Sequence, residues 1–230
     1  MIINQSIGFA FIHIPKSAGT SLMQYLSPLN GPLDLEIGGT LFGEQIQAAY
    51  IQRHGLEKHS TLADAQRVIN MTRAPREMFV FTFVRNPYAR LSSIFSFLRK
   101  WESYNPELLR LLKSFADFRE FVASEIFMHY PGPSNMFLPQ CNWIMVDGKP
   151  SSSMHCFRIE DAAKAIKILR HELILRGADA SLLPATLPCA NISESLPFEG
   201  FGLSDALVEK INDYYAEDFK AFGYSHLSLP

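Results

Sequence analysis

One stretch decides the fold of this chain: Phe9-Ala10-Phe11-Ile12-His13-Ile14-Pro15-Lys16-Ser17-Ala18-Gly19-Thr20-Ser21. The apolar run Phe9–Ile14 predicts a buried strand, which breaks at Pro15 into a short loop before a helix opens at Thr20. The start of a helix attracts anions, because its backbone N–H groups point outward and its dipole is positive there. With Lys16 beside these N–H groups, the stretch predicts a site for a phosphate-like group.

A second strand, Met78–Val84, is almost continuously apolar, as is typical of a parallel strand covered on both faces. It ends in Arg85-Asn86-Pro87, and a helix is expected from there to about Trp101. In open parallel sheets, ligands bind beyond the carboxyl ends of the strands. Because each strand ends in a cationic loop, with Lys16 and Arg85, we expect one ligand held at two anionic groups.

The remaining pattern alternates helices and strands. One helix is expected after a Ser60-Thr61 cap, and others are expected over 115–126, 161 to about 176, and 203–219. A short strand is expected at 155–159, and loops are expected at 29–43 and 130–133. Alternation of this kind predicts an α/β fold, a three-layer sandwich around a mostly parallel sheet. With 230 residues, the chain is expected to be a single domain over residues 1–230.

Composition excludes several classes of protein. The formal net charge of −2 argues against a nucleic-acid binder, which needs a basic excess to neutralise phosphates. No apolar segment approaches membrane-spanning length and no leader-like start is visible, so the expected compartment is the cytoplasm. Cys141, Cys156 and Cys189 are few and widely spaced, so no zinc site or disulfide framework is predicted, and each is expected to be buried and reduced.

The first motif differs from a Walker A loop, in which the lysine stands just before the helix. Here Lys16 comes early and Gly19 follows it, which disfavours a conventional ATP or GTP site. Residues 11–21 instead resemble the 5′-phosphosulfate loop of sulfotransferases that use 3′-phosphoadenosine-5′-phosphosulfate (PAPS). Residues 83–93, Phe-Val-Arg-Asn-Pro-Tyr-Ala-Arg-Leu-Ser-Ser, are similar to the 3′-phosphate segment of the same family. The similarity is greatest to the branch with heparan sulfate 2-O-sulfotransferases and bacterial members, and it implies a P-loop-like fold.

The resemblance implies a site for PAPS as co-substrate, without a metal. The donor-binding residues that it implies are Lys16, Ser17, Ala18, Gly19, Thr20 and Ser21 in the first loop, with Arg85 and Ser93 on the 3′-phosphate. Lys16 and the loop amides would stabilise the charge that grows on the leaving phosphate. Arg85 can fork onto a phosphate, and Ser93 can add a hydrogen bond.

The resemblance also implies that His59 is the base that takes a proton from a hydroxyl acceptor, a task suited to a group with a pKa near neutral. Glu160 is an alternative base. His13 is expected to be a buried, hydrogen-bonded residue, and Arg90 a structural residue that forms an ion pair. Two departures from the family pattern are Ala18, where glycine is frequent, and Ala89, where an acidic residue is frequent.

The function expected is transfer of a sulfuryl group from PAPS to a hydroxyl or amine of a glycan, a lipid or a small molecule. The acceptor is expected to contact residues 29–53 and 130–140, since long loops at the ligand end of a sheet usually set specificity. Two rival functions stay open. One is a nucleotide kinase, which would need Mg·ATP, and the other is a non-catalytic module that binds a nucleotide or a glycan.

Overall fold

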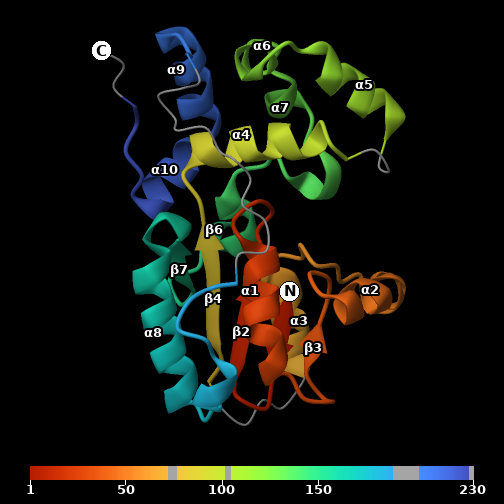
Figure 1. Ribbon diagram of the computed structural model, residues 1–230, viewed down its shortest axis with the longest axis vertical. Coiled ribbons are helices and arrows are strands. Elements are labelled where there is room, and N and C mark those ends of the chain that lie inside the picture. Colours follow the sequence, from red (N-terminus) through yellow and green to blue (C-terminus); the bar gives the residue numbers. More distant parts are fainter. Residues whose placement is uncertain (72–76, 102–104, 189–201, 228–230) are drawn as a thin grey trace. The chain divides into compact units, whose positions relative to one another are not determined.

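The computed structural model describes residues 1–71, 77–101, 105–188 and 202–227 (Figure 1). The chain divides into two compact units. Unit 1 comprises Met1–Val84 and Gln140–Asn191, and unit 2 comprises Arg85–Pro139 and Ile192–Pro230. The single sulfotransferase-type domain expected over 1–230 stays a prediction.

Unit 1 is built on a five-stranded sheet with the order β3-β1-β2-β4-β7. The strands are β1 (Ile2–Asn4), β2 (Phe9–Ile12), β3 (Leu35–Glu36), β4 (Phe79–Val84) and β7 (His155–Arg158). β2 pairs with β4 in parallel, and β4 pairs with β7 in parallel, whereas β1 is antiparallel to both of its neighbours. All strands except β1 therefore run in one direction, and the predicted mostly parallel sheet is confirmed.

Helices cover both faces of this sheet. The helices of unit 1 are α1 (Gly19–Leu26), α2 (Leu41–His54), α3 (Leu62–Met71) and α8 (Ala162–Leu175). Phe9 and Phe11 of β2 pack in one buried cluster with residues of α1 and α8. Ala10 and Ile12 point to the opposite face and are also buried, and α3 contacts β2. Figure 1 shows α1 in front of the sheet and α3 behind it, which gives three layers.

Unit 2 is helical. It contains α4 (Pro87–Leu98), α5 (Pro106–Ser114), α6 (Phe118–Ala123), α7 (Ile126–His129), α9 (Asp205–Tyr214) and α10 (Ala216–Phe222). Its core is largely aromatic and centres on Phe121, whose ring packs against those of Phe95, Phe127 and Phe137. Arg90 of α4 is 1% exposed and donates to the backbone carbonyls of Met136 and Leu138. A structural role for Arg90 is confirmed through these hydrogen bonds, and the expected ion pair stays a prediction.

Several elements differ from the sequence expectations. The helix α2 was not predicted, because Gly43 is its only buried residue and its apolar side chains form no stripe on one face. β1 and β3 have three and two residues, too few to show a period. The helix predicted over 115–126 is broken, because Glu125 adopts a left-handed conformation with φ 59° between α6 and α7. Among the described residues, no helix has the length and apolarity required to cross a bilayer.

Candidate functional site

The loop after β2 leads directly into α1, and its backbone is unusual. Lys16 and Ala18 both have left-handed conformations, with φ 64° and 60°. Ala18 occupies the N-cap position of α1 and has no side-chain oxygen to cap the helix. The first backbone bond of the helix runs from Leu22 N to Ala18 O at 3.1 Å. The amides that start α1 thus lack a cap from their own N-cap residue, which suits an anion-binding end.

Gly19, the first residue of α1, is packed against the ring of His13. A Cβ built on Gly19 would lie 1.8 Å from both Cδ2 and Nε2 of His13, a distance that no side chain could tolerate. His13 is 5% exposed, and its ring also stacks on Phe11 with 5.9 Å between centroids. Glycine is therefore required at position 19 because the loop folds over the His13 ring.

The side chain of Ser17 points into the protein interior. Its Oγ donates to Oε1 of Gln140 over 3.0 Å, and both residues are almost completely buried. Gln140 begins the short 3₁₀ segment η3 (Gln140–Ile144). The Ser17 hydroxyl thus attaches the loop to η3. Sequence reasoning missed Gln140, because nothing in its neighbourhood signals a partner 123 positions away.

His59 is held at two points. Its Nδ1 lies 2.8 Å from the backbone oxygen of His13, and the two rings meet edge to face with 4.5 Å between centroids. Trp143 of η3 donates from Nε1 to the backbone oxygen of His59 at 2.7 Å. Since a carbonyl can only accept, the proton of a neutral His59 sits on Nδ1 and the lone pair on Nε2. The structure thus brings His59 beside the residue on which the loop is packed.

The pKa of His13 is held well below its usual range. Burial is the main cause, the neighbouring His59 is the next, and the Met1 amino group, Lys58 and Lys16 add to it. Among the described residues, Nδ1 of His13 is the buried side-chain polar atom without a hydrogen-bond partner. Burial of His13 is confirmed, but its expected side-chain hydrogen bond is wrong for Nδ1, since packing holds the ring.

The other residues predicted to bind the sulfuryl donor belong to unit 2. Arg85 is the residue after β4, and Asn86 caps α4 by accepting from Tyr88 N and Ala89 N, with Pro87 at the first helical position. Ser93, two turns into α4, is 4% exposed. The local sequence explains this arrangement, because an Asn cap followed by proline starts a helix directly after the strand.

Three further predictions can be placed. Glu160, the alternative base, is exposed in η4 (Ile159–Asp161), which follows β7. Cys141 is buried as expected, whereas Cys156 is exposed because it lies in β7 at the edge of the sheet. Cys189 lies outside the described residues. In the part of the chain that the structure describes, no group of three or more His, Cys, Asp or Glu side chains is placed to hold a metal ion.

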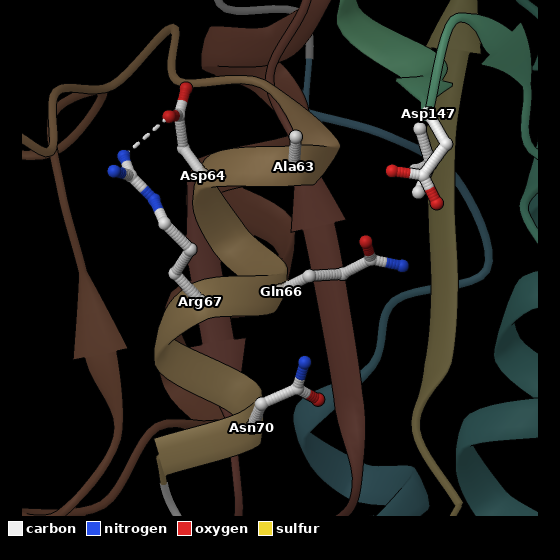
Figure 2. A pocket seen from close by; sticks show the side chains of 7 residues that line it. Ala63, Asp64, Gln66, Arg67, Asn70 and Asp147 are labelled. Carbon is white, nitrogen blue, oxygen red and sulfur yellow. Dashed lines mark hydrogen bonds and ion pairs between the residues drawn. The ribbon is translucent and has the colours of Figure 1, made fainter.

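A polar hollow of about 440 Å³ lies between α3 and the hairpin of β5 (Met145–Val146) and β6 (Lys149–Pro150). Its lining residues are Ala63, Asp64, Gln66, Arg67, Asn70, Val146 and Asp147. Figure 2 shows Asp64 paired with Arg67, and the amide of Gln66 directed toward Asp147. In the chain, α3 begins three residues after His59, and Trp143, which donates to the His59 carbonyl, stands two residues before β5. It includes neither of the two loops expected to contact an acceptor.

Comparison with known proteins decides the family. A family model described as "Sulfotransferase family" matches residues 1–163, which include His59 and both motifs predicted to bind anions. The chain belongs to the sulfotransferase family. No curated protein and no solved structure matches it. Sulfotransferases transfer a sulfuryl group, generally from PAPS, so this family membership makes the protein a transferase and gives the loop, His59 and the hollow a chemical context.

Proposed function

We propose that this sulfotransferase transfers the sulfuryl group of PAPS to a hydroxyl group of a carbohydrate or a small metabolite, with Lys16 and His59 as its catalytic residues. The contact between His59 and His13 carries the proposal, because His13 also packs against Gly19 at the start of α1. An amine acceptor would need the same base. The resemblance to heparan sulfate 2-O-sulfotransferases supports a sugar hydroxyl as the first acceptor to test.

The proposed reaction is an in-line transfer. The acceptor oxygen forms a bond to sulfur while the bond between sulfur and the bridging oxygen of the 5′-phosphate breaks, and 3′-phosphoadenosine-5′-phosphate leaves. Negative charge grows on that bridging oxygen. Lys16 and the backbone amides of the loop and of the α1 start stabilise this charge, as preorganised donors that need no reorientation during the reaction. The left-handed backbone at Lys16 and Ala18 supports this role.

The acceptor proton passes to His59. The hydrogen bond from Nδ1 to the His13 carbonyl leaves the lone pair on Nε2, the atom that we propose as the base. When Nε2 takes the proton, the charge of the imidazolium is stabilised by the same carbonyl, whose bond becomes charge-assisted. Glu160 is exposed in η4, whereas His59 contacts both the backbone oxygen and the ring of His13, so His59 is the better supported base.

The nucleotide is distinguished from ATP by its 3′-phosphate. We propose Arg85 and Ser93 as its ligands, on the basis of the motif in residues 83–93 and the position of Arg85 directly after the end of β4. The hollow along α3 supports an acceptor with several hydroxyl groups, since carboxylates, amides and a guanidinium line it. Residues 29–53 and 130–140 stay candidates for further acceptor contacts.

Donor binding is tested by thermal denaturation with 3′-phosphoadenosine-5′-phosphate, compared with 5′-AMP and Mg·ATP. At 100 times the Kd, a ligand specific for the folded state stabilises it by about 2.7 kcal/mol, or roughly 5–10 °C for a chain of this size. The bisphosphate is expected to stabilise the protein far more than AMP does, and Arg85→Ala and Ser93→Ala should remove most of the difference. Stabilisation by Mg·ATP alone would indicate a kinase instead.

Transfer itself is tested with sulfur-labelled PAPS and a panel of glycans, lipids and small hydroxyl compounds. Lys16→Ala and His59→Ala are each expected to lower kcat by about 100-fold or more, because they remove charge stabilisation and the general base. His155→Ala is the matched control, since it removes a histidine that packs on Phe79 within the same unit. Near-normal turnover by both loop and base variants would refute the mechanism, and tight bisphosphate binding without turnover would indicate a binding module.

A further inference from the structure

His13 has a combination of properties that stability alone does not explain. Its ring is buried, Nδ1 has no hydrogen-bond partner, and it forces glycine at position 19. A buried polar atom without a partner costs about 1–3 kcal/mol. A buried atom of this kind in a native protein therefore indicates a functional role.

The contacts of His13 connect the two parts of the candidate site. Cδ2 and Nε2 of its ring lie against Gly19, at the first residue of α1. Its ring meets the ring of His59 edge to face, and its backbone oxygen accepts the proton of His59 Nδ1. One residue therefore touches both the start of the anion-binding helix and the proposed base, and it does so with a rigid group.

We propose that His13 is a positioning residue: its uncharged ring is a wedge between Gly19 and His59 that holds His59 Nδ1 on the His13 carbonyl and keeps the lone pair on Nε2. The inference rests on the proposed function of His59. In this proposal His13 does not take the proton of the acceptor. It determines which nitrogen of His59 takes that proton. The low pKa of His13 agrees with this role, because a charged wedge would repel the imidazolium that forms on His59.

His59 needs both the hydrogen bond to the His13 carbonyl and the packing against the His13 ring to keep one orientation and one tautomer. A single hydrogen bond leaves an imidazole free to turn about that bond, and a neutral histidine can carry its proton on either nitrogen. The edge-to-face packing of the two rings removes this freedom, and edge-to-face aromatic pairs contribute about 0.5–1.5 kcal/mol beyond burial. Without the His13 ring, we expect His59 to turn and to populate the tautomer with its proton on Nε2, which cannot act as a base there.

The test is imidazole nitrogen NMR of the full chain, which reports the tautomer of each histidine without any acceptor. In the wild-type protein, His59 is expected to be protonated on Nδ1. In His13→Ala, signals of a tautomer mixture are expected for His59, while His129, an exposed histidine of unit 2, serves as an internal control. A wild-type His59 protonated on Nε2, or an unchanged tautomer in His13→Ala, overturns the proposal.

Gly19→Ala provides a second arm, because its methyl group would displace the ring of His13. This variant is expected to lose both the His59 tautomer and affinity for the bisphosphate. The double variant His13→Ala/Gly19→Ala removes the clash, so bisphosphate binding should recover while the tautomer stays mixed. Recovery of both properties in the double variant would show that the His13 ring is not needed to position His59.

Kinetics separate positioning from a structural defect. For His13→Ala, kcat is expected to fall at least tenfold, with KM for PAPS within about threefold of the wild-type value, and His155→Ala should match the wild type in both. A wild-type protein that binds no bisphosphate would refute the proposed function, yet the NMR result on His59 would still decide the inference. Transfer with an unchanged kcat in His13→Ala would refute the inference and leave the proposed function intact.

Discussion

At the scale of single residues, the backbone of the loop after β2 is strained at Ala18, where glycine would relieve the strain. Ala18 has φ 60° and ψ 18°, a left-handed conformation that costs an alanine roughly 1–2 kcal/mol more than it costs glycine. Glycine at this position also lowers the free energy of unfolding by about 0.4–1 kcal/mol, because it raises the conformational entropy of the unfolded chain. The difference between these effects decides the sign of a substitution here.

Ala18→Gly is therefore expected to stabilise the protein by roughly 0.5–1 kcal/mol, since relief of the left-handed strain exceeds the entropic loss. The midpoint of thermal unfolding should rise by about 1–3 °C. Ala48→Gly is the matched control, because Ala48 is exposed within α2 and the same change in a helix costs about 1 kcal/mol. Destabilisation by both substitutions would contradict the strain at Ala18.

His13 also predicts a pH dependence of stability. Its pKa is lowered in the folded state, whereas the unfolded chain has a value near 6.5. Above pH 6.5 both states are neutral, and below it only the unfolded state takes up the proton, so stability falls as the pH falls. From pH 7 to pH 5.5 the loss attributable to His13 should be about 1 kcal/mol.

Urea unfolding at pH 7 and pH 5.5 measures this loss. His13→Ala is expected to show a smaller decrease between the two pH values than the wild-type protein, although it is less stable at both because of the cavity that it creates. An equal pH decrease in the two proteins would mean that His13 titrates normally in the folded state.

At the scale of elements, the loop and η3 are joined by the buried bond between Ser17 Oγ and Gln140 Oε1. Removing one partner leaves the other buried and unsatisfied. Gln140→Leu is therefore expected to cost about 1–3 kcal/mol of stability and to weaken binding of the bisphosphate, because the loop loses its attachment.

A double-mutant cycle with Ser17→Ala measures this coupling. Because the two partners touch, the double variant should be more stable than the sum of the two single changes predicts, by about 0.5–1.5 kcal/mol in urea unfolding. Strict additivity would mean that the Ser17–Gln140 bond contributes nothing to the loop.

At the scale of the whole molecule, each unit has its own buried core, and each has one of the two tryptophans. Trp143 belongs to unit 1, and Trp101 packs against the core of unit 2. Single-tryptophan variants, Trp101→Phe and Trp143→Phe, therefore report the unfolding of each unit separately.

Arg90→Met is expected to destabilise unit 2 by about 3 kcal/mol, because two backbone carbonyls lose hydrogen bonds from a charged donor. The urea midpoint reported by Trp101 should fall by about 1–2 M, and that reported by Trp143 should fall less. Equal shifts at both tryptophans would show that the two cores unfold as one cooperative unit.

Much of unit 1 could be predicted from its sequence. The strands β2 and β4 are apolar, uncharged and followed by turn signals, so their existence and their cationic ends were clear. The start of α1 and both ends of α8 differ from expectation by only one residue, and the bounds of α4 in unit 2 differ by a few. The helix α2 escaped prediction because it buries almost nothing. The break at Glu125 escaped because no glycine or proline marks it.

The sequence by itself determined the family, and it predicted two anion-binding motifs and a candidate base, because loop and strand-end chemistry depends on residues that are neighbours in the chain. Only the tertiary structure decided that Ser17 turns inward to Gln140, that His13 excludes any side chain at position 19, and that His59 has its proton on Nδ1. These features join residues that are 6 to 123 positions apart in the chain. Packing fixes them, and no local propensity records which buried partner a side chain will meet.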